Sequence, residues 1–198
     1  MARTFRKNVS GFTLVELMIV VTVLAILVGI SAPRFEAWNR INRLKSGVRQ
    51  VAASIQNARF KAINENRRCY IDFAPGALTP ADSFFTIWLD VDGDQSYDSG
   101  EIDSTMIGFP DARGGFPGFK LSRGVGFGAN GPASGPEGMA VAADGVDFNG
   151  VDLVGFNAQG EGTAGVVYLT GEGGYIFAVA VSRLGRVRTY RWEDNQWR

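Results

Sequence analysis

The chain has 198 residues, of which 45% are hydrophobic, and its 20 basic side chains balance its 20 acidic ones. This length accommodates one domain of ordinary size together with a membrane helix. The sequence contains no histidine and a single cysteine, Cys69. An enzyme would therefore lack the usual general base and the commonest metal ligand, and an internal disulfide is excluded. Cys69 is most simply a small buried apolar residue, and we expect the folded part to be held together by its core alone. Composition does not exclude an enzyme, but our interpretation of the whole sequence is a structural protein without catalytic activity.

The first predicted element is an apolar helix that follows a short basic leader, residues 1–11. Three basic side chains lie in the leader: Arg3, Arg6 and Lys7. Basic residues ahead of a span favour a cytoplasmic N-terminus, with the rest of the chain outside. The next 21 residues, 12–32, contain one charged side chain and are enough to span a bilayer as a helix. With Pro33 at the exit, we predict a transmembrane helix over 12–33.

The single charged residue of this run is Glu16. A carboxylate at bilayer depth costs about 2.5–3.5 kcal/mol on insertion scales, so it is rarely there without a partner. The run itself contains no basic residue, and the partner must therefore come from elsewhere. We interpret Glu16 as an assembly device; the alternative is a plain membrane anchor with a chance glutamate.

The helical pattern continues through residues 34–68. Apolar side chains recur there every three or four positions and form one stripe, which comprises Phe35, Trp38, Ile41, Leu44, Val48, Val51, Ile55, Ala58, Ala62 and Ile63. The opposite face is basic, because this segment holds nine Lys and Arg residues against two Glu residues. We expect the stripe to pack on a sheet of the same chain. The basic face would contact anionic headgroups, meet acidic surfaces of neighbouring molecules or be solvated.

The pattern changes at residue 69 to short β-rich segments separated by turn residues. Strands are predicted at 69–73, 84–89, 103–109, 119–125, 152–157, 165–170, 175–181 and 187–192. The second and third of these pair with each other, the Gly-rich segment 126–147 is a long loop, and the last strand closes the sheet. The fold class is therefore α+β, with an antiparallel β-sheet head over 69–198 packed on the outer half of one long helix. The head is acidic, with eight Lys and Arg residues against 17 Asp and Glu residues.

One loop of the head, residues 90–101, concentrates acidic side chains. Its acids stand at loop positions 1, 3, 5, 9 and 12 with a serine at 7, the oxygen spacing of an EF-hand calcium loop. Position 6, which should be glycine, is Gln95, and the flanking segments are typical of strands rather than helices. Two interpretations remain open: a solvated hairpin turn, or a Ca²⁺ site with the ligands Asp90, Asp92, Asp94, Ser96, Asp98 and Glu101. We expect no other cofactor.

The last predicted strand combines basic and aromatic side chains. In a strand, alternate residues share one face, which here presents Arg186, Arg188, Tyr190 and Trp192. Two guanidiniums in line with two aromatic rings suit a nucleic-acid strand, with phosphate contacts and base stacking. The alternative is that these arginines pair with acidic residues of the head or of a neighbouring molecule. The acidic character of the head favours this alternative.

Two stretches of the sequence resemble a known family. Residues 11–21, Gly-Phe-Thr-Leu-Val-Glu-Leu-Met-Ile-Val-Val, resemble the class III signal of type IV pilins and pseudopilins. The resemblance implies the type IV pilin fold, cleavage after Gly11 by a membrane-bound prepilin peptidase and N-methylation of Phe12. It also implies that the new amino group pairs with Glu16 of a neighbouring subunit inside a filament. The implied partners are other pilin or pseudopilin subunits, the peptidase and an inner-membrane assembly platform, with a single-pass chain in the bacterial inner membrane and a periplasmic head.

The second stretch is the C-terminal Gly-Arg-x-Arg pattern at Gly185, Arg186 and Arg188, with the strands before it. Together they resemble the GspH/FimT branch of minor pilins and pseudopilins. In the H-type pseudopilins the implied role is structural, in the pseudopilus of type II protein secretion. In the FimT-like pilins the Gly-Arg-x-Arg end is associated with DNA binding during DNA uptake. We take the minor pseudopilin as the predicted function and the DNA-binding minor pilin as the alternative; the head contains no catalytic constellation.

Overall fold

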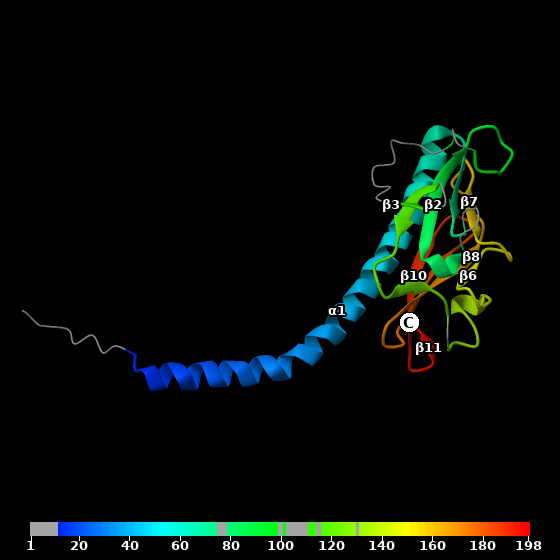
Figure 1. Cartoon of the computed structure of the whole chain (residues 1–198). Coiled ribbons are helices and arrows are strands. Elements are labelled where there is room, and N and C mark those ends of the chain that lie inside the picture. Colours follow the sequence, from blue (N-terminus) through cyan, green and yellow to red (C-terminus); the bar gives the residue numbers. More distant parts are fainter. Residues whose placement is uncertain (1–11, 75–78, 99–100, 102–110, 114–115, 130) are drawn as a thin grey trace, which may run out of the picture. The chain divides into compact units, whose positions relative to one another are not determined.

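The computed structural model in Figure 1 describes residues 12–74, 79–98, 101, 111–113, 116–129 and 131–198. The chain divides into two compact units, Met1–Asn39 and Arg40–Arg198. One helix, α1 (Leu14–Glu65), contributes to both units. The predicted α+β class, a long helix followed by an antiparallel β head, is confirmed.

The first unit consists, within its described part, of the N-terminal portion of α1. Its large apolar side chains are exposed, from Phe12 at 82% to Val20 at 46%. The Thr22 hydroxyl donates to the Met18 carbonyl at 2.7 Å, which satisfies this polar group inside the helix. Apolar surface of this extent normally marks contact with lipid or with other proteins. Among the described residues no single helix meets the length and hydropathy of a membrane span, whereas Leu14–Gly29 and Arg34–Glu65 taken together do, by length and composition alone.

In the second unit, the predicted apolar stripe of α1 forms one wall of the core. Six side chains at spacings of three or four residues are at most 5% exposed: Leu44, Val48, Val51, Ile55, Ala58 and Ala62. This spacing places them on one helical face. Three other residues assigned to the stripe from the sequence are exposed: Phe35 at 61%, Trp38 at 59% and Ile63 at 41%. The stripe therefore ends one turn before the helix does.

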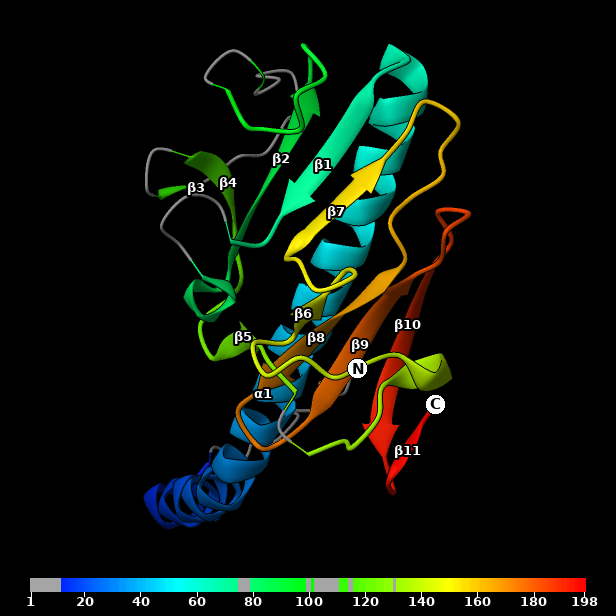
Figure 2. The ribbon, with the colours of Figure 1, turned by 90° about the vertical axis from the view of Figure 1, so that its right-hand side faces the viewer.

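Two antiparallel sheets pack on this face of α1, and Figure 2 shows both on the same side of the helix. The first has the spatial order β3-β4-β2-β1-β7. Its strands are β1 (Arg68–Asp72), β2 (Phe84–Asp90), β3 (Asp111–Arg113), β4 (Phe116–Lys120) and β7 (Leu153–Phe156). The second has the order β11-β10-β9-β8-β5, with β6 also paired to β8. Its strands are β5 (Val125–Phe127), β6 (Val146–Asp147), β8 (Gly165–Gly171), β9 (Ile176–Val181), β10 (Val187–Glu193) and β11 (Gln196–Trp197).

The prediction of one sheet was therefore wrong. After β7 the chain turns back on that strand, with a bridge between Phe156 and Gly162 and a hydrogen bond from the Thr163 N–H to the Gly155 carbonyl at 3.0 Å. This return occupies the free edge of β7, so β8 cannot pair there. The chain then begins a second sheet, in which β8 pairs with β9.

The strand predicted at 119–125 is two strands in the structure, one in each sheet. Its first residues belong to β4, where Phe119 pairs with Phe85 of β2, and its last belong to β5, which pairs with β8. Between them Gly124 adopts a φ of 78°, a conformation that favours glycine. The break carries the chain from the first sheet to the second. The predicted strand at 103–109 lies outside the described residues.

The Gly-rich segment predicted as a loop over 126–147 is irregular apart from the end of β5, the short 3-10 helix η2 (Pro136–Gly138) and β6. A second 3-10 turn, η1 (Pro80–Asp82), precedes β2. In Figure 2 the Gly-rich segment crosses the second sheet on the side away from α1. Met139 and Val141 pack there on a second small cluster formed by Val166, Tyr168, Ala178 and Ala180. The segment therefore covers the outer face of this sheet.

Candidate functional site

The acidic residue of the N-terminal run, Glu16, lies in the first turn of α1 and caps it. Its Oε2 accepts hydrogen bonds from the backbone N–H and the hydroxyl of Thr13, both at 3.1 Å. In return, the Thr13 Oγ1 accepts the backbone N–H of Glu16 at 3.2 Å. These reciprocal bonds form a capping box, which satisfies N–H groups that have no partner within the helix. The Glu16 carboxylate therefore faces the N-terminal end of the helix, where it bonds to Thr13, the residue that follows Phe12.

Sequence reasoning missed this cap, although Thr13-x-x-Glu16 is its usual signature. The omission matters, because a capping role and an intermolecular ion pair make different demands on the side chain. Glutamine can replace glutamate in a capping box, whereas only glutamate carries charge. Gly11, the residue before the predicted cleavage point, lies outside the described residues.

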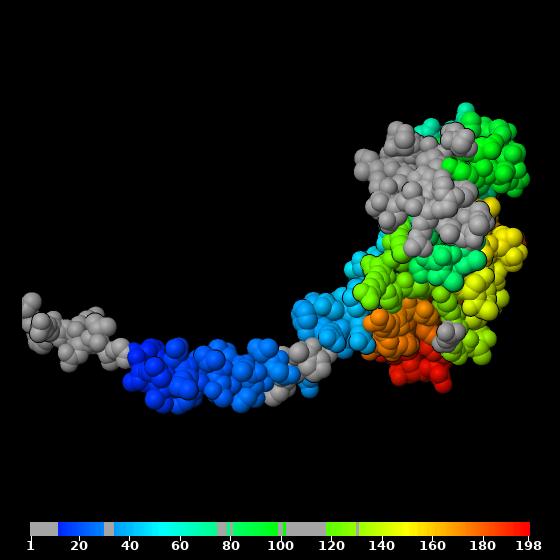
Figure 3. Space-filling view, in the orientation of Figure 1, coloured from blue at the N-terminus to red at the C-terminus, as the bar shows by residue number. Residues whose placement is uncertain are grey.

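The acidic loop begins where β2 ends, and Figure 3 shows it at the surface of the head, in green. The structure brings together one carboxylate oxygen each from Asp90, Asp92 and Asp94, all within 4.8 Å of one another. Each of these side chains also accepts a backbone N–H further along the loop: Gly93 to Asp90 at 2.6 Å, Asp94 to Asp92 at 3.2 Å and Ser96 to Asp94 at 2.7 Å. Such local bonds fold the loop backbone around the carboxylates.

The other predicted ligands of this loop take different positions. Glu101 is 4% exposed, and its two carboxylate oxygens accept the N–H groups of Val91 at 2.7 Å and Asp98 at 3.0 Å. Glu101 therefore joins the start of the loop, at Val91, to its later part, at Asp98. Among the described residues, Asp98 and Glu101 are not part of the three-carboxylate group, and Ser96 contributes a backbone N–H to Asp94.

In the C-terminal strand, the face predicted to bind nucleic acid makes contacts within the head. Arg188 and Tyr190 of β10 both donate to the Glu137 carboxylate of η2, in an ion pair and a hydrogen bond respectively. The hydrogen bonds from Tyr190 and Arg188 hold the pKa of Glu137 below its usual value. The same contacts, from Tyr190 first and Glu137 second, raise the pKa of Arg188. For Arg188 the structure therefore agrees with the alternative interpretation, in which the arginine pairs with an acidic residue of the head.

The second aromatic residue of that face, Trp192, packs on the last hairpin. Its ring centroid lies 5.1 Å from that of Trp197 on β11. Trp197 in turn donates its indole N–H to the Ser134 carbonyl at 2.8 Å. The Gly-rich segment therefore binds β10 and β11 through both Glu137 and Ser134. Arg186 is exposed, and nothing in the sequence marked Glu137 as the partner, because it is 51 residues away from Arg188.

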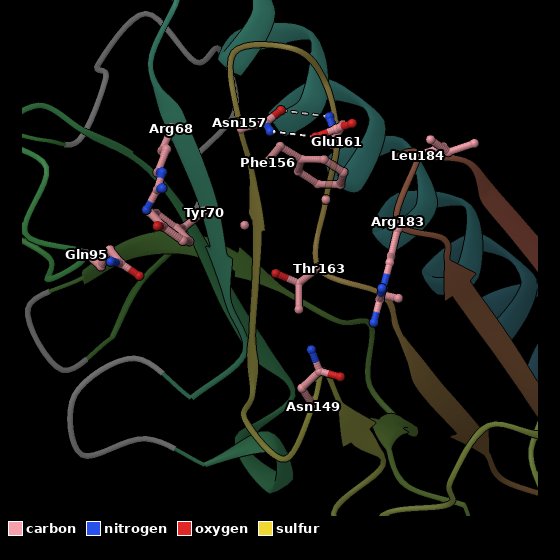
Figure 4. A pocket seen from close by; sticks show the side chains of 13 residues that line it. Arg68, Tyr70, Gln95, Asn149, Phe156, Asn157, Glu161, Thr163, Arg183 and Leu184 are labelled. Carbon is pink, nitrogen blue, oxygen red and sulfur yellow. Dashed lines mark hydrogen bonds between the residues drawn. The ribbon is translucent and has the colours of Figure 1, made fainter.

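A groove of about 690 Å³ lies where the two sheets meet. Figure 4 shows Arg68 and Arg183 on opposite sides of it, with Phe156, Asn157 and Glu161 between them. Asn157 donates its amide to the Glu161 carboxylate at 3.1 Å and accepts the Glu161 N–H at 2.9 Å. The groove is lined by polar and apolar residues and holds both signs of charge, and no sequence pattern indicated it.

A family model described as the prokaryotic N-terminal methylation motif matches residues 6–32. The chain carries this methylation motif. The match covers the predicted cleavage point, Phe12 and Glu16, and it confirms that the N-terminus has a methylation motif of the predicted kind.

The chain is also similar to solved structures. For the type IV minor pilin FimU of Pseudomonas aeruginosa, the identity is 15% over 81% of this chain and 96% of that chain, with a TM-score of 0.47. For the minor pseudopilin EpsH of the type 2 secretion system of Vibrio cholerae, the identity is 12% over 74% of this chain and 95% of that chain, with a TM-score of 0.44. A search of curated proteins gave no match.

Proposed function

We propose that this protein is a structural subunit of a type IV pilin-like filament, and specifically a minor pseudopilin of type II protein secretion. The observation that carries the proposal is the methylation motif at residues 6–32, with Glu16 inside an otherwise apolar run. In this account the chain is made with a leader, cut after Gly11, methylated at Phe12 and held in the inner membrane with its head in the periplasm. It is then added to the filament by the assembly platform.

The mechanism proposed for assembly is the association of apolar helices around one ion pair per contact. The exposed apolar side chains of the first unit would leave lipid and pack on the same segment of neighbouring subunits. Cleavage creates an amino group on Phe12, and Glu16 of a neighbour is the acid that could pair with it. Removing one partner of a buried pair typically costs about 3–5 kcal/mol, because the other charge stays buried and unpaired.

A structural role suits the head better than DNA binding does. The predicted nucleic-acid face has Arg188 and Tyr190 engaged by Glu137, and Trp192 packed on Trp197. DNA would have to compete with these contacts and approach a head in which acids outnumber bases by 17 to eight. A gel-shift titration of DNA with the wild-type protein and with a variant that lacks Arg186 and Arg188 tests the point. For a pseudopilin we expect neither protein to retard the DNA.

Three substitutions separate the ion pair from the helix cap. Glu16→Ala removes both, Glu16→Gln keeps the cap and removes the charge, and Thr13→Ala weakens the cap and keeps the charge. We expect both Glu16 variants to be processed normally but to be depleted from filaments, and Thr13→Ala to be incorporated far better than either. The measurement is the ratio of sheared filament subunit to membrane-bound subunit by immunoblot.

Normal incorporation of Glu16→Gln would contradict the assembly mechanism, because it would leave the cap as the whole role of Glu16. Equal depletion of all three variants would do the same. If the leader is not removed from any of the three variants, the substitutions have altered the signal that the peptidase recognises, and the step affected is cleavage rather than assembly.

A further inference from the structure

We propose that the loop after β2 is a Ca²⁺ site in which Asp90, Asp92 and Asp94 supply the carboxylate ligands. The inference concerns the head alone and does not depend on the proposed function. It begins from the geometry of the three side chains, whose carboxylate oxygens lie within 4.8 Å of one another. Oxygens that share one Ca²⁺ ion at 2.3–2.6 Å lie up to about 5 Å apart, so this group already has the dimensions of a shared ion.

The second observation is a buried oxygen without a partner. Asp90 is 4% exposed, and while its Oδ1 accepts the Gly93 N–H, its Oδ2 is buried with no hydrogen-bond partner among the described residues. A buried polar atom left unsatisfied destabilises the fold, and more so when it is charged. A cation at the three-carboxylate group would satisfy this oxygen and remove the repulsion among three like charges.

Two arginines lie close to the loop without neutralising it. Arg67 and Arg68 line a hollow of about 490 Å³ together with Asp90, Asp92 and Gly93. The guanidinium of Arg67 donates to the Val91 carbonyl at 3.3 Å, and within the described part of the loop no carboxylate is paired with it. The loop holds five acidic side chains over residues 90–101, so two guanidiniums leave it acidic.

The backbone of the loop is held in place around the three carboxylates. Glu101 fixes the two ends of the loop, and Gly93 and Gln95 turn the chain with φ values of 89° and 64°. The donor set contains only oxygen, which suits Ca²⁺ and not the transition metals that prefer nitrogen or sulfur. Three carboxylates, with water or backbone carbonyls as the remaining ligands, form a site like the weak Ca²⁺ sites of extracellular modules. We therefore expect a dissociation constant for Ca²⁺ on the order of 10⁻⁴–10⁻³ M.

The test compares the full chain in nonionic detergent with its Asp92→Asn/Asp94→Asn variant. Asparagine accepts the same backbone N–H groups, so the variant keeps the loop bonds and loses two charges. A matched control, Glu161→Gln/Asp194→Asn, removes two exposed acids elsewhere in the head. The melting temperature of each is measured in EDTA, in millimolar Ca²⁺ and in millimolar Mg²⁺.

A second readout reports on binding at this loop directly. Trp88 lies two residues before Asp90, and its ring centroid is 6.3 Å from that of Tyr97 in the loop. Excitation of Trp88 should therefore sensitise Tb³⁺ bound in place of Ca²⁺, and the emission should fall as Ca²⁺ is added. The Trp88→Phe variant identifies the fraction of emission that comes from this site.

We expect Ca²⁺ to raise the melting temperature of the wild type and of the control, and not that of the double variant. In EDTA the double variant should be at least as stable as the wild type, because it has lost the repulsion. Tb³⁺ should bind the double variant at least about tenfold more weakly, since ligand charge sets the affinity of such sites. An unchanged wild-type melting temperature in Ca²⁺, an equal rise in the double variant, or equal stabilisation by Mg²⁺ would overturn the proposal.

Discussion

At the scale of single residues, two carboxylates of the head have pKa values that are shifted in opposite directions by their surroundings. Glu137 accepts hydrogen bonds from Tyr190 and Arg188, which lower its pKa. Asp152 has a raised pKa, because it is partly buried and close to Asp144, Asp72 and Asp147. A lowered acid pKa adds stability at neutral pH, and a raised one removes it. The two carboxylates should therefore respond to substitution with opposite signs.

Glu137→Gln is expected to lower the melting temperature at neutral pH. A carboxyl with a lowered folded-state pKa contributes its stability fully above the ordinary value of 4.5, and this stability is lost as the pH falls through the lowered value. Glutamine can still accept from Tyr190, so the variant isolates the charge. The difference in melting temperature between variant and wild type, measured from pH 7 to pH 3, should shrink below pH 4.5; a difference that is constant with pH would contradict the assigned contact.

Asp152→Asn is expected to raise the melting temperature at neutral pH. When the folded-state pKa is above the ordinary value of 3.8, the folded state binds the proton more tightly, so stability increases as the pH falls through the raised value. The advantage of the asparagine should therefore be largest near pH 7 and disappear at acidic pH, where the wild-type carboxyl is protonated. A variant that is less stable than the wild type at both extremes would rule out this explanation.

At the scale of elements, the sequence predicted the helix and most strands because their signals are local. The stripe of α1 follows from spacing alone, and β8, β9 and β10 occupy the predicted positions within one or two residues. The division into two sheets was not predictable in the same way, because a strand pattern does not specify which edges pair, and here the return at Phe156 and Gly162 occupies the edge of β7. The hairpin to β11 was missed, although Asp194 and Asn195, with φ values of 52° and 60°, form a turn that a local reading of Asp-Asn could have suggested.

The candidate sites divide along the same line. Glu16 and the spacing of Asp90, Asp92 and Asp94 can be read from neighbouring positions in the sequence. The partner of Arg188 could not, because η2 reaches β10 only after the Gly-rich segment has crossed the sheet. The burial of the Asp90 Oδ2 atom is likewise a property of the folded head.

The buried stripe of α1 gives a direct test of element packing in the head. Ile55 is 0% exposed, whereas Phe60 on the same helix is 61% exposed. Ile55→Ala should lower the free energy of unfolding by about 2–5 kcal/mol, because it removes buried methyl groups and leaves a cavity. Phe60→Ala should change it by less than about 0.5 kcal/mol in detergent-solubilised protein. Equal losses in denaturant titrations of the two variants would show that the stripe is not the packed face.

At the scale of the whole molecule, the two units bury apolar surface in different ways. The second unit closes its own core around the helix stripe and both sheets. The first leaves large apolar side chains exposed, and these need lipid or other subunits. Two ion pairs of the second unit, from Arg40 at 3.3 Å and Arg43 at 4.0 Å to Glu172 after β8, join the basic face of α1 to the second sheet. A chain with one self-sufficient unit and one apolar segment that lacks cover of its own fits the proposed storage in the membrane followed by filament assembly.

The proposed function depends most on the chemistry of the N-terminus in the cell. If the methylation motif directs processing, the native polypeptide should begin at Phe12, with residues 1–11 removed and one methyl group on the new α-amino nitrogen. Intact-mass and N-terminal peptide mass spectrometry of protein purified from its own membranes measure this directly. A polypeptide that still carries the leader ahead of Phe12 would contradict the account.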